Sequence, residues 1–385
     1  MSAPTPQTRL PKVGTTIFTV ISQLALEHRA VNTGQGFPDF EPPERLTDLV
    51  AHHLRSRHNQ YAPMAGAIPL REAIAAKVAR HYGRVASPAS EITVTCGGTE
   101  ALAASIQALV HPGDEVVVLE PAYDSYEPIA ELCGATVRRV PLTRPDFGVD
   151  WQRLRDALSP RTRLVIVNTP HNPSGACLGP ADLDQLAEAI RGSDAFVLAD
   201  EVYEHMVFDG VRHASLNAHP ELAARSIVVS YFGKTYHATG WKIGYCVAPP
   251  ALTAELRKVH QFVTFAIATP LQHAIADFMT ERPEWEDALS SFYQAKRDRL
   301  AGLLAGTRLR FLPARSTYFQ LVDYSAISDL PDSEFALQLI RDPGVANIPV
   351  SPFCSHASPA ERIVRLCFAK EDATLVAAAE RLRAL

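Results

Sequence analysis

The sequence has no CxxC pair, no long run of like charges and no apolar stretch of the roughly 18 residues needed to cross a bilayer. Six cysteines in 385 residues do not make a disulfide framework, so they fit a reducing compartment. The amino-terminal residues lack the apolar core of a secretory signal. A net charge of -5 argues against a nucleic-acid surface or a polybasic membrane patch. We therefore expect a cytoplasmic protein without nucleic-acid or membrane partners.

Short apolar runs rich in Val and Ile recur through the middle of the chain. They do not alternate with polar residues, which is typical of strands buried on both faces of a helix-covered parallel sheet. Stretches with helical spacing lie between several of them, so the pattern predicts an α/β layered domain. The runs span residues 91–98, 114–123, 163–175, 195–203, 226–234 and 243–250, and the helical stretches include 99–110 and 180–192.

The composition changes toward both ends of the chain. From about residue 285 a long amphipathic pattern is followed by shorter strand candidates and a terminal helical pattern, which predicts a smaller α+β domain. We expect three parts: an N-terminal arm that belongs partly to the small domain (1–45), a large domain (46–284) and a small C-terminal domain (285–385).

Each apolar run ends in residue types that a strand does not need. Because the carboxyl ends of the strands share one edge of such a sheet, we expect these side chains to converge there on a ligand. They are Gly98 and Thr99 after the first run, then Tyr123, Asn172, Asp200, Tyr203 and Lys234.

These residue types suit one kind of ligand. A Gly-Gly-Thr turn at a helix start binds anions such as phosphate, and an aromatic side chain offers a face to a flat ring. A buried carboxylate needs a cationic partner, and a partly desolvated lysine can form a Schiff base through its neutral amine. Pyridoxal phosphate is a phosphorylated aldehyde on a basic ring, so it can bind to all four of these groups: the turn, the aromatic face, the carboxylate and the lysine.

Each residue taken alone also has an ordinary interpretation. Lys234 could be a surface lysine, or part of a P-loop, but that motif needs a glycine where the chain has Val228. Asp200 could cap a turn, and Asn172 could start one. Tyr123 could be a core residue and Lys242 a solvated one.

Three segments resemble the signature segments of the class I/II aminotransferases of fold type I: NTPHNPSG (168–175), ADEVYEH (199–205) and SYFGKTYHATGWKIGY (230–245). The similarity runs from about residue 13 to the carboxyl terminus. Within the family, the chain most resembles the branch of methionine and kynurenine (glutamine–phenylpyruvate) aminotransferases, and methionine aminotransferases above all. The resemblance implies a large domain with a mostly parallel seven-stranded sheet and a smaller α+β domain.

The resemblance also implies roles for the residues around pyridoxal 5'-phosphate. Lys234 matches the Schiff-base lysine and general base, and Asp200 matches the partner of the pyridine nitrogen. Tyr203 and Asn172 match the partners of the phenolic oxygen, and Tyr123 matches the stacking ring. Gly98, Thr99 and Lys242 correspond to phosphate ligands. Relatives often have a phosphate-binding serine where this chain has Tyr231, with Ser230 before it, and either residue could make that contact.

Three further residues match positions that face the substrate or the neighbouring subunit. Arg365 matches the arginine that binds the substrate carboxylate, whereas nearby Arg362 has no motif support. Gly36 lies in a segment that resembles the one closing over the substrate, where a backbone N–H faces the carboxylate. Tyr61 resembles a tyrosine that reaches the phosphate of the neighbouring subunit, so we expect a homodimer with shared active sites. No metal is expected.

The implied activity is ping-pong transfer of the α-amino group from methionine and other bulky apolar or aromatic amino acids to a 2-oxo acid. Plausible pocket walls are Phe18, Tyr61, Phe265 and Tyr318. The alternative is a kynurenine/glutamine transaminase with β-lyase activity on cysteine S-conjugates. A transcription regulator with an aminotransferase-like sensor domain is disfavoured, because the similarity begins within the first 20 residues and the net charge is negative.

Overall fold

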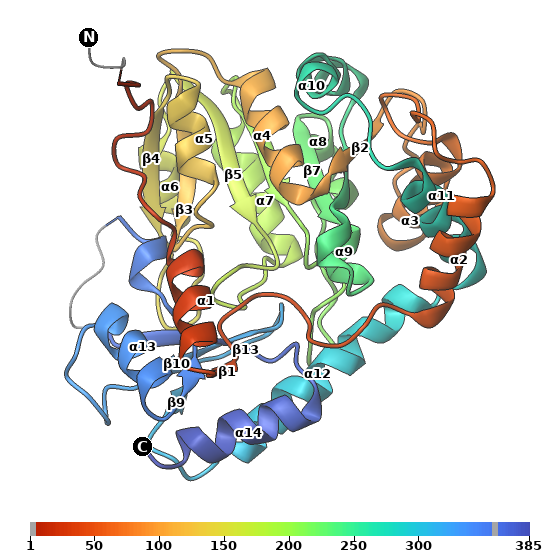
Figure 1. Ribbon diagram of the computed structural model, residues 1–385. Helices are drawn as coiled ribbons and strands as arrows, with labels where there is room; N and C mark the ends of the chain where they lie inside the picture. Colours follow the sequence, from red (N-terminus) through yellow and green to blue (C-terminus); the bar gives the residue numbers. More distant parts are fainter. Residues whose placement is uncertain (1–4, 356–360) are drawn as a thin grey trace.

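A seven-stranded sheet between layers of helices forms the larger part of the computed structural model, which describes residues 5–355 and 361–385 (Figure 1). The strand order is β2-β8-β7-β6-β5-β3-β4; β8 is antiparallel to both neighbours and the other pairs are parallel. The predicted mostly parallel sheet is confirmed. The strands are β2 (Ile92–Cys96), β3 (Glu115–Glu120), β4 (Thr136–Pro141), β5 (Thr162–Asn168), β6 (Phe196–Asp200), β7 (Ser226–Tyr231) and β8 (Ile243–Val247).

Both faces of the sheet are covered, which explains why the apolar runs do not alternate. In β3, Val116 and Val118 pack into the core on one face, while Val117 and Leu119 pack into the core on the other. The first face is covered by α4 (Gly97–Leu109), α5 (Tyr126–Leu132) and α10 (Pro250–Val263), the second by α6 (Trp151–Ala157), α7 (Pro180–Ile190) and α8 (Pro220–Ala223).

A further group of helices packs against the β2–β8 end of the sheet. It consists of α2 (Glu44–Arg55), α3 (Ile68–Tyr82) and α11 (Thr269–Glu281), and it lies on the right in Figure 1. α2 packs along α11, and Arg45 and Glu281 form an ion pair of 2.7 Å between them. These helices carry the segment around Tyr61 on the outside of the molecule.

Helix ends follow local capping chemistry. α7 starts with Pro180, and the carboxylate of Asp182 accepts a hydrogen bond of 2.8 Å from the N–H of Gly179. α6 is capped by Asp150, which accepts from the N–H groups of Gln152 and Arg153. The helix predicted from residue 99 starts earlier, at Gly97, directly after β2.

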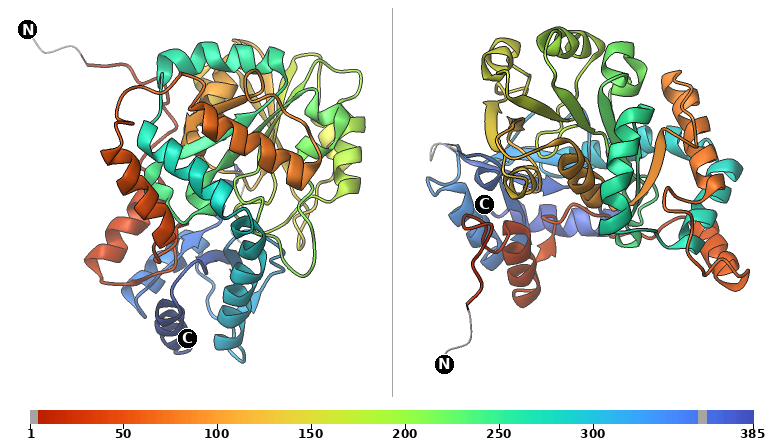
Figure 2. Two further views of the ribbon diagram at one scale, coloured as in Figure 1. Left: turned by 90° about the vertical axis from the view of Figure 1, so that its right-hand side faces the viewer. Right: turned by 90° about the horizontal axis from the view of Figure 1, so that it is seen from above.

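The smaller part of the molecule is built on a four-stranded antiparallel sheet, drawn below the large sheet in Figure 1 and in the left view of Figure 2. Its order is β12 (Ile348–Pro349), β13 (Ile363–Cys367), β10 (Phe319–Asp323) and β9 (Arg310–Phe311). α12 (Trp285–Leu303), α13 (Asp332–Arg341) and α14 (Asp372–Leu382) contribute to its core. None of the helices in the described ranges is long and apolar enough to span a membrane.

The N-terminal segment joins this smaller part. Ile21 and Ala25 of α1 (Ile17–Glu27) belong to the same core, and β1 (Val31–Asn32) pairs in parallel with β11 (Val345–Ala346). The segment that follows, from Thr33 to Phe37, crosses toward the large sheet. It therefore lies between the two sheets, where the cavity described next is found.

Candidate active site

The chain leaves β7 and returns in β8 at the same edge of the large sheet. Tyr231 of β7 pairs with Gly244, and Cys96 of β2 pairs with Ile243. Between β7 and β8 lie only the short helix α9 (Phe232–Thr235) and a turn of 3₁₀-helix, η2 (Thr239–Trp241). Lys234 in α9 and Lys242 just before β8 are therefore brought to one edge, although they are eight positions apart in the sequence.

A cavity of about 350 Å³ opens at this edge, between the two sheets. Ten of the eleven predicted site residues line it, and Tyr61 is the exception. The ten come from the large sheet, the smaller sheet and the crossing segment: Gly36, Gly98, Thr99, Tyr123, Asn172, Asp200, Tyr203, Lys234, Lys242 and Arg365.

Lys234 lines the cavity and is half-buried. Its Nζ donates hydrogen bonds to the carbonyl of Gly36 over 2.8 Å and to the hydroxyl of Tyr318 over 2.7 Å. It also lies 5.5 Å from the centre of the Tyr203 ring. Burial lowers the pKa of the Lys234 amine to about 8. A substantial fraction of this lysine is therefore neutral, and nucleophilic, near physiological pH.

Asp200 is the last residue of β6, and only one oxygen of its buried carboxylate has a hydrogen-bond donor among the described residues. Its Oδ2 accepts a hydrogen bond of 2.6 Å from the hydroxyl of Tyr126. Its Oδ1 is buried, and no donor among the described residues reaches it. Burial raises the pKa of Asp200 to about 6. Buried polar atoms are nearly always paired, so Oδ1 lacks a donor that a ligand in the cavity could supply.

The first turn of α4 and Lys242 together form a positively charged corner. Gly97 has φ = 69°, and a Cβ at this position would lie 3.2 Å from Nζ of Lys242. The lysine amine thus lies against the start of α4, whose free N–H groups and dipole favour an anion. Gly98 and Thr99 belong to this first turn and line the cavity.

Ser230 and Tyr231 face opposite sides of the sheet. The Ser230 hydroxyl donates to buried Glu204, away from the cavity. Tyr231 lines the cavity; its hydroxyl donates to the carbonyl of Thr239, and its ring lies 5.7 Å below Nζ of Lys242. The ring leaves no room for a side chain at Gly233, where a Cβ would approach it to 2.4 Å. Of the two candidates, only Tyr231 therefore reaches the corner next to Lys242.

Arg365 brings a buried guanidinium from β13 of the smaller sheet. It donates to the side-chain oxygen of Asn172 over 2.7 Å and to the carbonyl of Gly34 over 3.0 Å. Its guanidinium carbon lies 3.9 Å from the centre of the Phe319 ring. Among the described residues that line the cavity, it is the only arginine. By contrast, the side chain of Arg362 pairs with Asp329 over 2.8 Å, outside the cavity.

The other predicted residues differ in how the structure places them. Tyr203 is buried and packs edge-to-face on Tyr318, and Tyr123 packs in the same way on Tyr126. Gly36 contributes a carbonyl that accepts from Lys234, in addition to the N–H expected from the sequence. Tyr61 lies on the surface, 83% exposed.

Sequence reasoning missed several groups that hold the site together. Tyr126 donates to Asp200, and Asn168 accepts from the N–H of Asn172 over 2.7 Å and donates to the carbonyl of Asp200 over 2.8 Å. Asn168 ends β5, so the rule that strand ends carry functional residues could have found it. Tyr126 lies inside α5, where nothing in the sequence distinguishes it from a core residue.

Comparisons with known proteins identify the family of this chain. Residues 29–382 match the family described as aminotransferase class I and II. The chain is 54% identical to methionine aminotransferase of Escherichia coli, over 99% of this chain and 98% of that one. It is 34% identical to human kynurenine–oxoglutarate transaminase 1, over 94% of this chain and 93% of that one.

Solved structures give the same result. The fold matches the crystal structure of an E. coli protein identified as a methionine aminotransferase with a TM-score of 0.97, over the whole of both chains at 54% identity. It matches N-succinyldiaminopimelate aminotransferase of Mycobacterium tuberculosis with a TM-score of 0.94 at 40% identity, over 99% of this chain and 100% of that one. The chain belongs to the class I and II aminotransferase family. It is a pyridoxal-phosphate-dependent enzyme that acts on amino acids and 2-oxo acids.

The residues that line the cavity fit this cofactor. The unpaired Oδ1 of Asp200 suits a protonated pyridine nitrogen, since it lacks a donor. The corner formed by α4 and Lys242 suits a phosphate. The amine of Lys234, with its lowered pKa, suits an aldehyde.

Proposed function

We propose that this enzyme transfers the α-amino group of methionine and other bulky apolar or aromatic amino acids to a 2-oxo acid by a ping-pong mechanism. One observation carries the proposal: a single cavity joins the amine of Lys234 to the guanidinium of Arg365, with Phe18 and Phe319 beside that guanidinium. One arginine can bind one carboxylate, and the aromatic rings suit an apolar side chain.

We assign the cofactor contacts as follows. Asp200 pairs with the pyridine nitrogen, Tyr203 and Asn172 bind the phenolic oxygen, and Tyr123 stacks on the ring. The phosphate is bound by Gly98, Thr99 and Lys242, with Tyr231 rather than Ser230 beside them. Bound pyridoxal phosphate supplies the electron sink that stabilises negative charge at the substrate's α-carbon.

The chain's own groups perform the remaining steps. Arg365 binds the α-carboxylate and so fixes the orientation of the α-carbon toward Lys234. Lys234, whose neutral form is well populated near physiological pH, removes the α-proton as general base and returns a proton as general acid. Gly36 and Tyr318 hold its amine in position before substrate binds. The first 2-oxo acid leaves before the second one enters.

Initial rates over a matrix of donor and acceptor concentrations test the proposal. Parallel double-reciprocal lines are expected, as is higher kcat/KM for methionine, phenylalanine and leucine than for aspartate. An apolar pocket separates substrates that differ by one methylene by only about 1–3 kcal/mol, so broad donor use is expected. Preference for aspartate by more than tenfold would contradict the apolar pocket.

The similarity to kynurenine–oxoglutarate transaminases supports a second candidate, a kynurenine/glutamine transaminase with β-lyase activity on cysteine S-conjugates. Release of pyruvate from such a conjugate, measured beside keto-acid formation from methionine, separates the two. If kcat/KM for kynurenine or for β-elimination exceeds that for methionine, the second candidate is the correct one.

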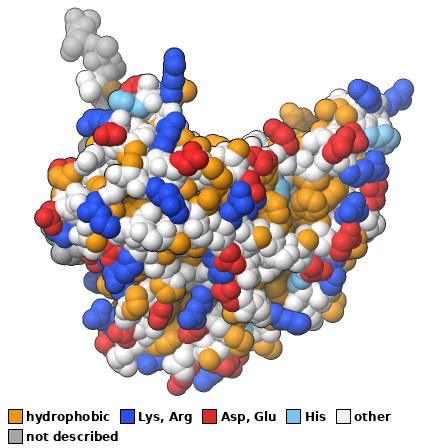
Figure 3. All heavy atoms as spheres, turned by 90° about the horizontal axis from the view of Figure 1, so that it is seen from below, with side chains coloured by type: hydrophobic (Ala, Val, Ile, Leu, Met, Phe, Trp, Pro, Cys, Tyr) orange, Lys and Arg blue, Asp and Glu red, His pale blue; other side chains and the backbone are white. Residues whose placement is uncertain are grey.

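We further propose a homodimer in which Tyr61 reaches the phosphate of the neighbouring subunit. Tyr61 packs edge-to-face on Phe265, with ring centres 5.3 Å apart, and nearby Phe262 is 85% exposed. Aromatic side chains exposed together are typical of an interaction surface. Seen from below, the molecule is hollowed between two lobes, and apolar side chains gather on the wall of this hollow (Figure 3).

Mixed dimers provide a sharp test of the shared site. Lys234→Ala and Tyr61→Ala chains, each inactive or weak alone, are co-expressed with different tags and the hybrid is purified. If Tyr61 serves the neighbouring subunit, one site of the hybrid is intact and about half the wild-type activity returns. If Tyr61 serves its own chain, both sites remain defective.

The domain limits at residues 45 and 284 and the cytoplasmic location stay predictions.

A further inference from the structure

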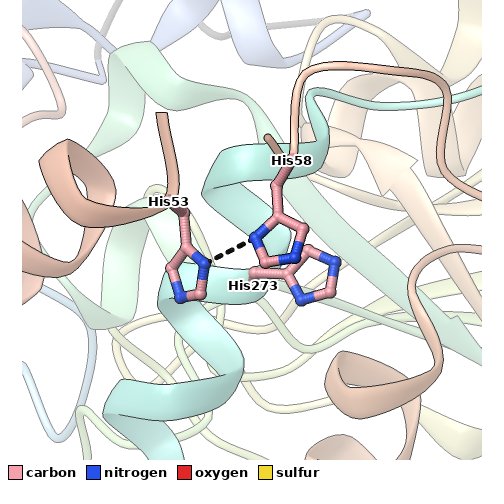
Figure 4. Close-up of side chains that lie close together, drawn as sticks. All are labelled: His53, His58 and His273. Carbon is pink, nitrogen blue, oxygen red and sulfur yellow. Dashed lines mark hydrogen bonds between the residues drawn. The ribbon is translucent and has the colours of Figure 1, made fainter. Parts of the chain in front are cut away.

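Three histidines from separate segments meet where α2 packs along α11 (Figure 4), and none of them lines the cavity. His53 lies in α2, His58 lies in the segment that follows it, and His273 lies in α11. One ring nitrogen from each lies within 4.8 Å of the other two. His53 is buried, while His58 and His273 are partly exposed, so the cluster is open to ions from solvent.

The hydrogen bonds of the cluster define which nitrogens are free to bind. Nε2 of His53 contacts Asp277 Oδ2 over 2.8 Å, and Nδ1 of His53 contacts Nδ1 of His58 over 2.8 Å. If Nε2 donates to the carboxylate, the lone pair of neutral His53 is on Nδ1 and points at the other two rings. A carboxylate behind a histidine in this way is the usual outer partner of a metal-binding imidazole.

The three histidine rings need only small movements to bind one common ion. Two nitrogen ligands of a tetrahedral zinc ion lie about 3.3 Å apart, since each Zn–N bond is about 2.0–2.1 Å. The His53 and His58 nitrogens are slightly closer than this. The rings of His58 and His273 are stacked with centres 4.0 Å apart, and each must tilt to direct a nitrogen at a common ion. Because both are partly exposed, neither is locked by core packing.

The surrounding structure holds the three histidines near one another. The side-chain amide of Asn59 donates to the carbonyl of Leu54 over 2.8 Å, and the hydroxyl of Thr269 donates to the carbonyl of Gln60 over 2.6 Å. The segment that carries His58 is thus tied to both helices. α2 ends at Arg55, so the negative end of its dipole lies beside the cluster and favours a cation.

A second cluster shows why this one is the better candidate. His81, His205 and Glu286 also lie within reach of one ion. There the carboxylate already pairs with Arg80 over 2.6 Å, and buried Lys77 lies 3.9 Å from its other oxygen. These cations repel a metal ion, whereas Asp277 supplies a negative charge behind His53.

We propose that His53, His58 and His273 bind one divalent transition-metal ion of the zinc class, which cross-links α2, the segment after it and α11. Three imidazole nitrogens with a fourth position open to water match the ligand preference of zinc, and of cobalt as its spectroscopic substitute. The sequence offers no spaced motif for this site, because His273 lies more than 200 residues from His53 and His58 and only the fold brings them together.

The test uses cofactor-loaded protein without a polyhistidine tag, stripped of metal by a chelator. Added Co²⁺ is expected to give visible ligand-field bands that saturate at one ion per chain and disappear when Zn²⁺ displaces it. Competition with a chromophoric chelator then gives the Zn²⁺ affinity. His58→Ala and His273→Ala are each expected to weaken it at least about 100-fold, and Asp277→Asn about 10–100-fold.

Two control variants keep the outcome unambiguous. His111→Ala removes an exposed histidine outside both clusters, and His81→Ala removes a ligand of the second cluster; neither should change the affinity. Metal-free aminotransferase activity shows that His58→Ala and His273→Ala remain folded, since neither lies in the active site. Unchanged Zn²⁺ affinity in folded His58→Ala, or loss of binding in His81→Ala, would overturn the proposal.

Discussion

Arg365 and Asn172 connect the two sheets of the molecule at the active site through a hydrogen bond of 2.7 Å between a guanidinium nitrogen and an amide oxygen. Arg365 belongs to β13 of the smaller sheet, and Asn172 follows β5 of the larger one. The arginine Nε, in contrast, is buried, and no acceptor among the described residues contacts it. The guanidinium is therefore held in place with one edge incompletely satisfied, as a site for a substrate carboxylate requires.

Replacing Arg365 with lysine tests this arrangement. A lysine cannot make the same planar contacts, so we expect the binding of 2-oxo acids to weaken by about 1.5–3 kcal/mol. This corresponds to a Kd roughly 10–150-fold higher. The cofactor absorbance should stay unchanged, because Arg365 is proposed to bind the substrate carboxylate and not the cofactor. Arg362→Lys is the matched control, since Arg362 pairs with Asp329 outside the cavity. Equal effects of the two substitutions would contradict the assignment.

Lys234 should react with aldehydes at a lower pH than ordinary lysines do. Its lowered pKa of about 8 means that the neutral amine reaches half its full population near pH 8, rather than above pH 10. In cofactor-free protein, the initial rate of pyridoxal phosphate attachment should therefore rise with a midpoint near pH 8. Borohydride trapping followed by peptide mass spectrometry measures it, and Lys234→Arg should give no adduct. A midpoint above pH 9.5 would show that the amine is not desolvated.

Ser230 and Tyr231 should differ in their effect on cofactor binding. Ser230→Ala should change the Kd of pyridoxal phosphate less than about threefold, because its hydroxyl is bonded to Glu204. Tyr231→Phe loses the bond to Thr239, which holds the turn before Lys242. A typical hydrogen bond contributes about 0.5–1.5 kcal/mol, which corresponds to a Kd roughly 2–10-fold higher. Titration of cofactor-free protein, followed by absorbance, measures both, and the opposite order would assign the phosphate contact to Ser230.

The parts of the site that sequence could predict are those that follow buried strands. Asp200 and Lys234 were predictable because β6 and β7 are continuous apolar runs whose ends must share one edge of the sheet. Strand β4 was missed, since it is an edge strand with Arg138 and Arg139 among its residues and no continuous apolar run. Its stability comes from pairing with β3 and from ion pairs that no local pattern reveals.

Tertiary contacts were beyond the reach of sequence patterns. Tyr126 donates to Asp200 across 74 residues, and the partner of the Ser230 hydroxyl depends on which side of β7 it faces. Family resemblance could suggest that a phosphate contact is made near residue 231. Only the alternation of side chains along the strand, fixed by its pairing with β6 and β8, decides which residue faces the cavity.

A buried ion pair behind the active site should be sensitive to the loss of one partner. Nζ of Lys77 lies 2.7 Å from Oε1 of Glu204, and both side chains are almost inaccessible to solvent. Lys77→Met leaves the carboxylate unpaired, so we expect it to lower the free energy of unfolding by about 3–5 kcal/mol. Lys77→Met with Glu204→Gln should cost less than Lys77→Met alone. Denaturant unfolding measures the cycle.

An exposed ion pair serves as the control for this cycle. Arg191 and Glu221 are 3.1 Å apart, and both are largely exposed. Arg191→Met should cost at most about 1 kcal/mol, because water solvates the remaining charge. If the Lys77 and Arg191 substitutions had similar effects, the buried carboxylate of Glu204 would have to be neutral or hydrated in the folded protein.

Asp200 should destabilise the cofactor-free protein and stabilise the cofactor complex. Burial raises its pKa from an ordinary value near 4 to about 6, so the folded state binds the proton more tightly than the unfolded state. The resulting decrease in the free energy of unfolding is fully present above about pH 6 and is lost as the pH falls toward 4. A shift of about two pKa units corresponds to a cost on the order of 3 kcal/mol.

Asp200→Asn removes this charge but keeps an oxygen that can accept from Tyr126. In cofactor-free protein it should raise the free energy of unfolding by up to about 3 kcal/mol at pH 8, and by progressively less as the pH falls below 6. With cofactor bound, the variant should lose roughly 10²–10⁴-fold in kcat, because the proposed partner of the pyridine nitrogen is gone. Urea unfolding at several pH values and steady-state rates measure the two effects. A cofactor-free variant less stable than wild type at pH 8 would mean that the Asp200 carboxylate is satisfied by the protein itself.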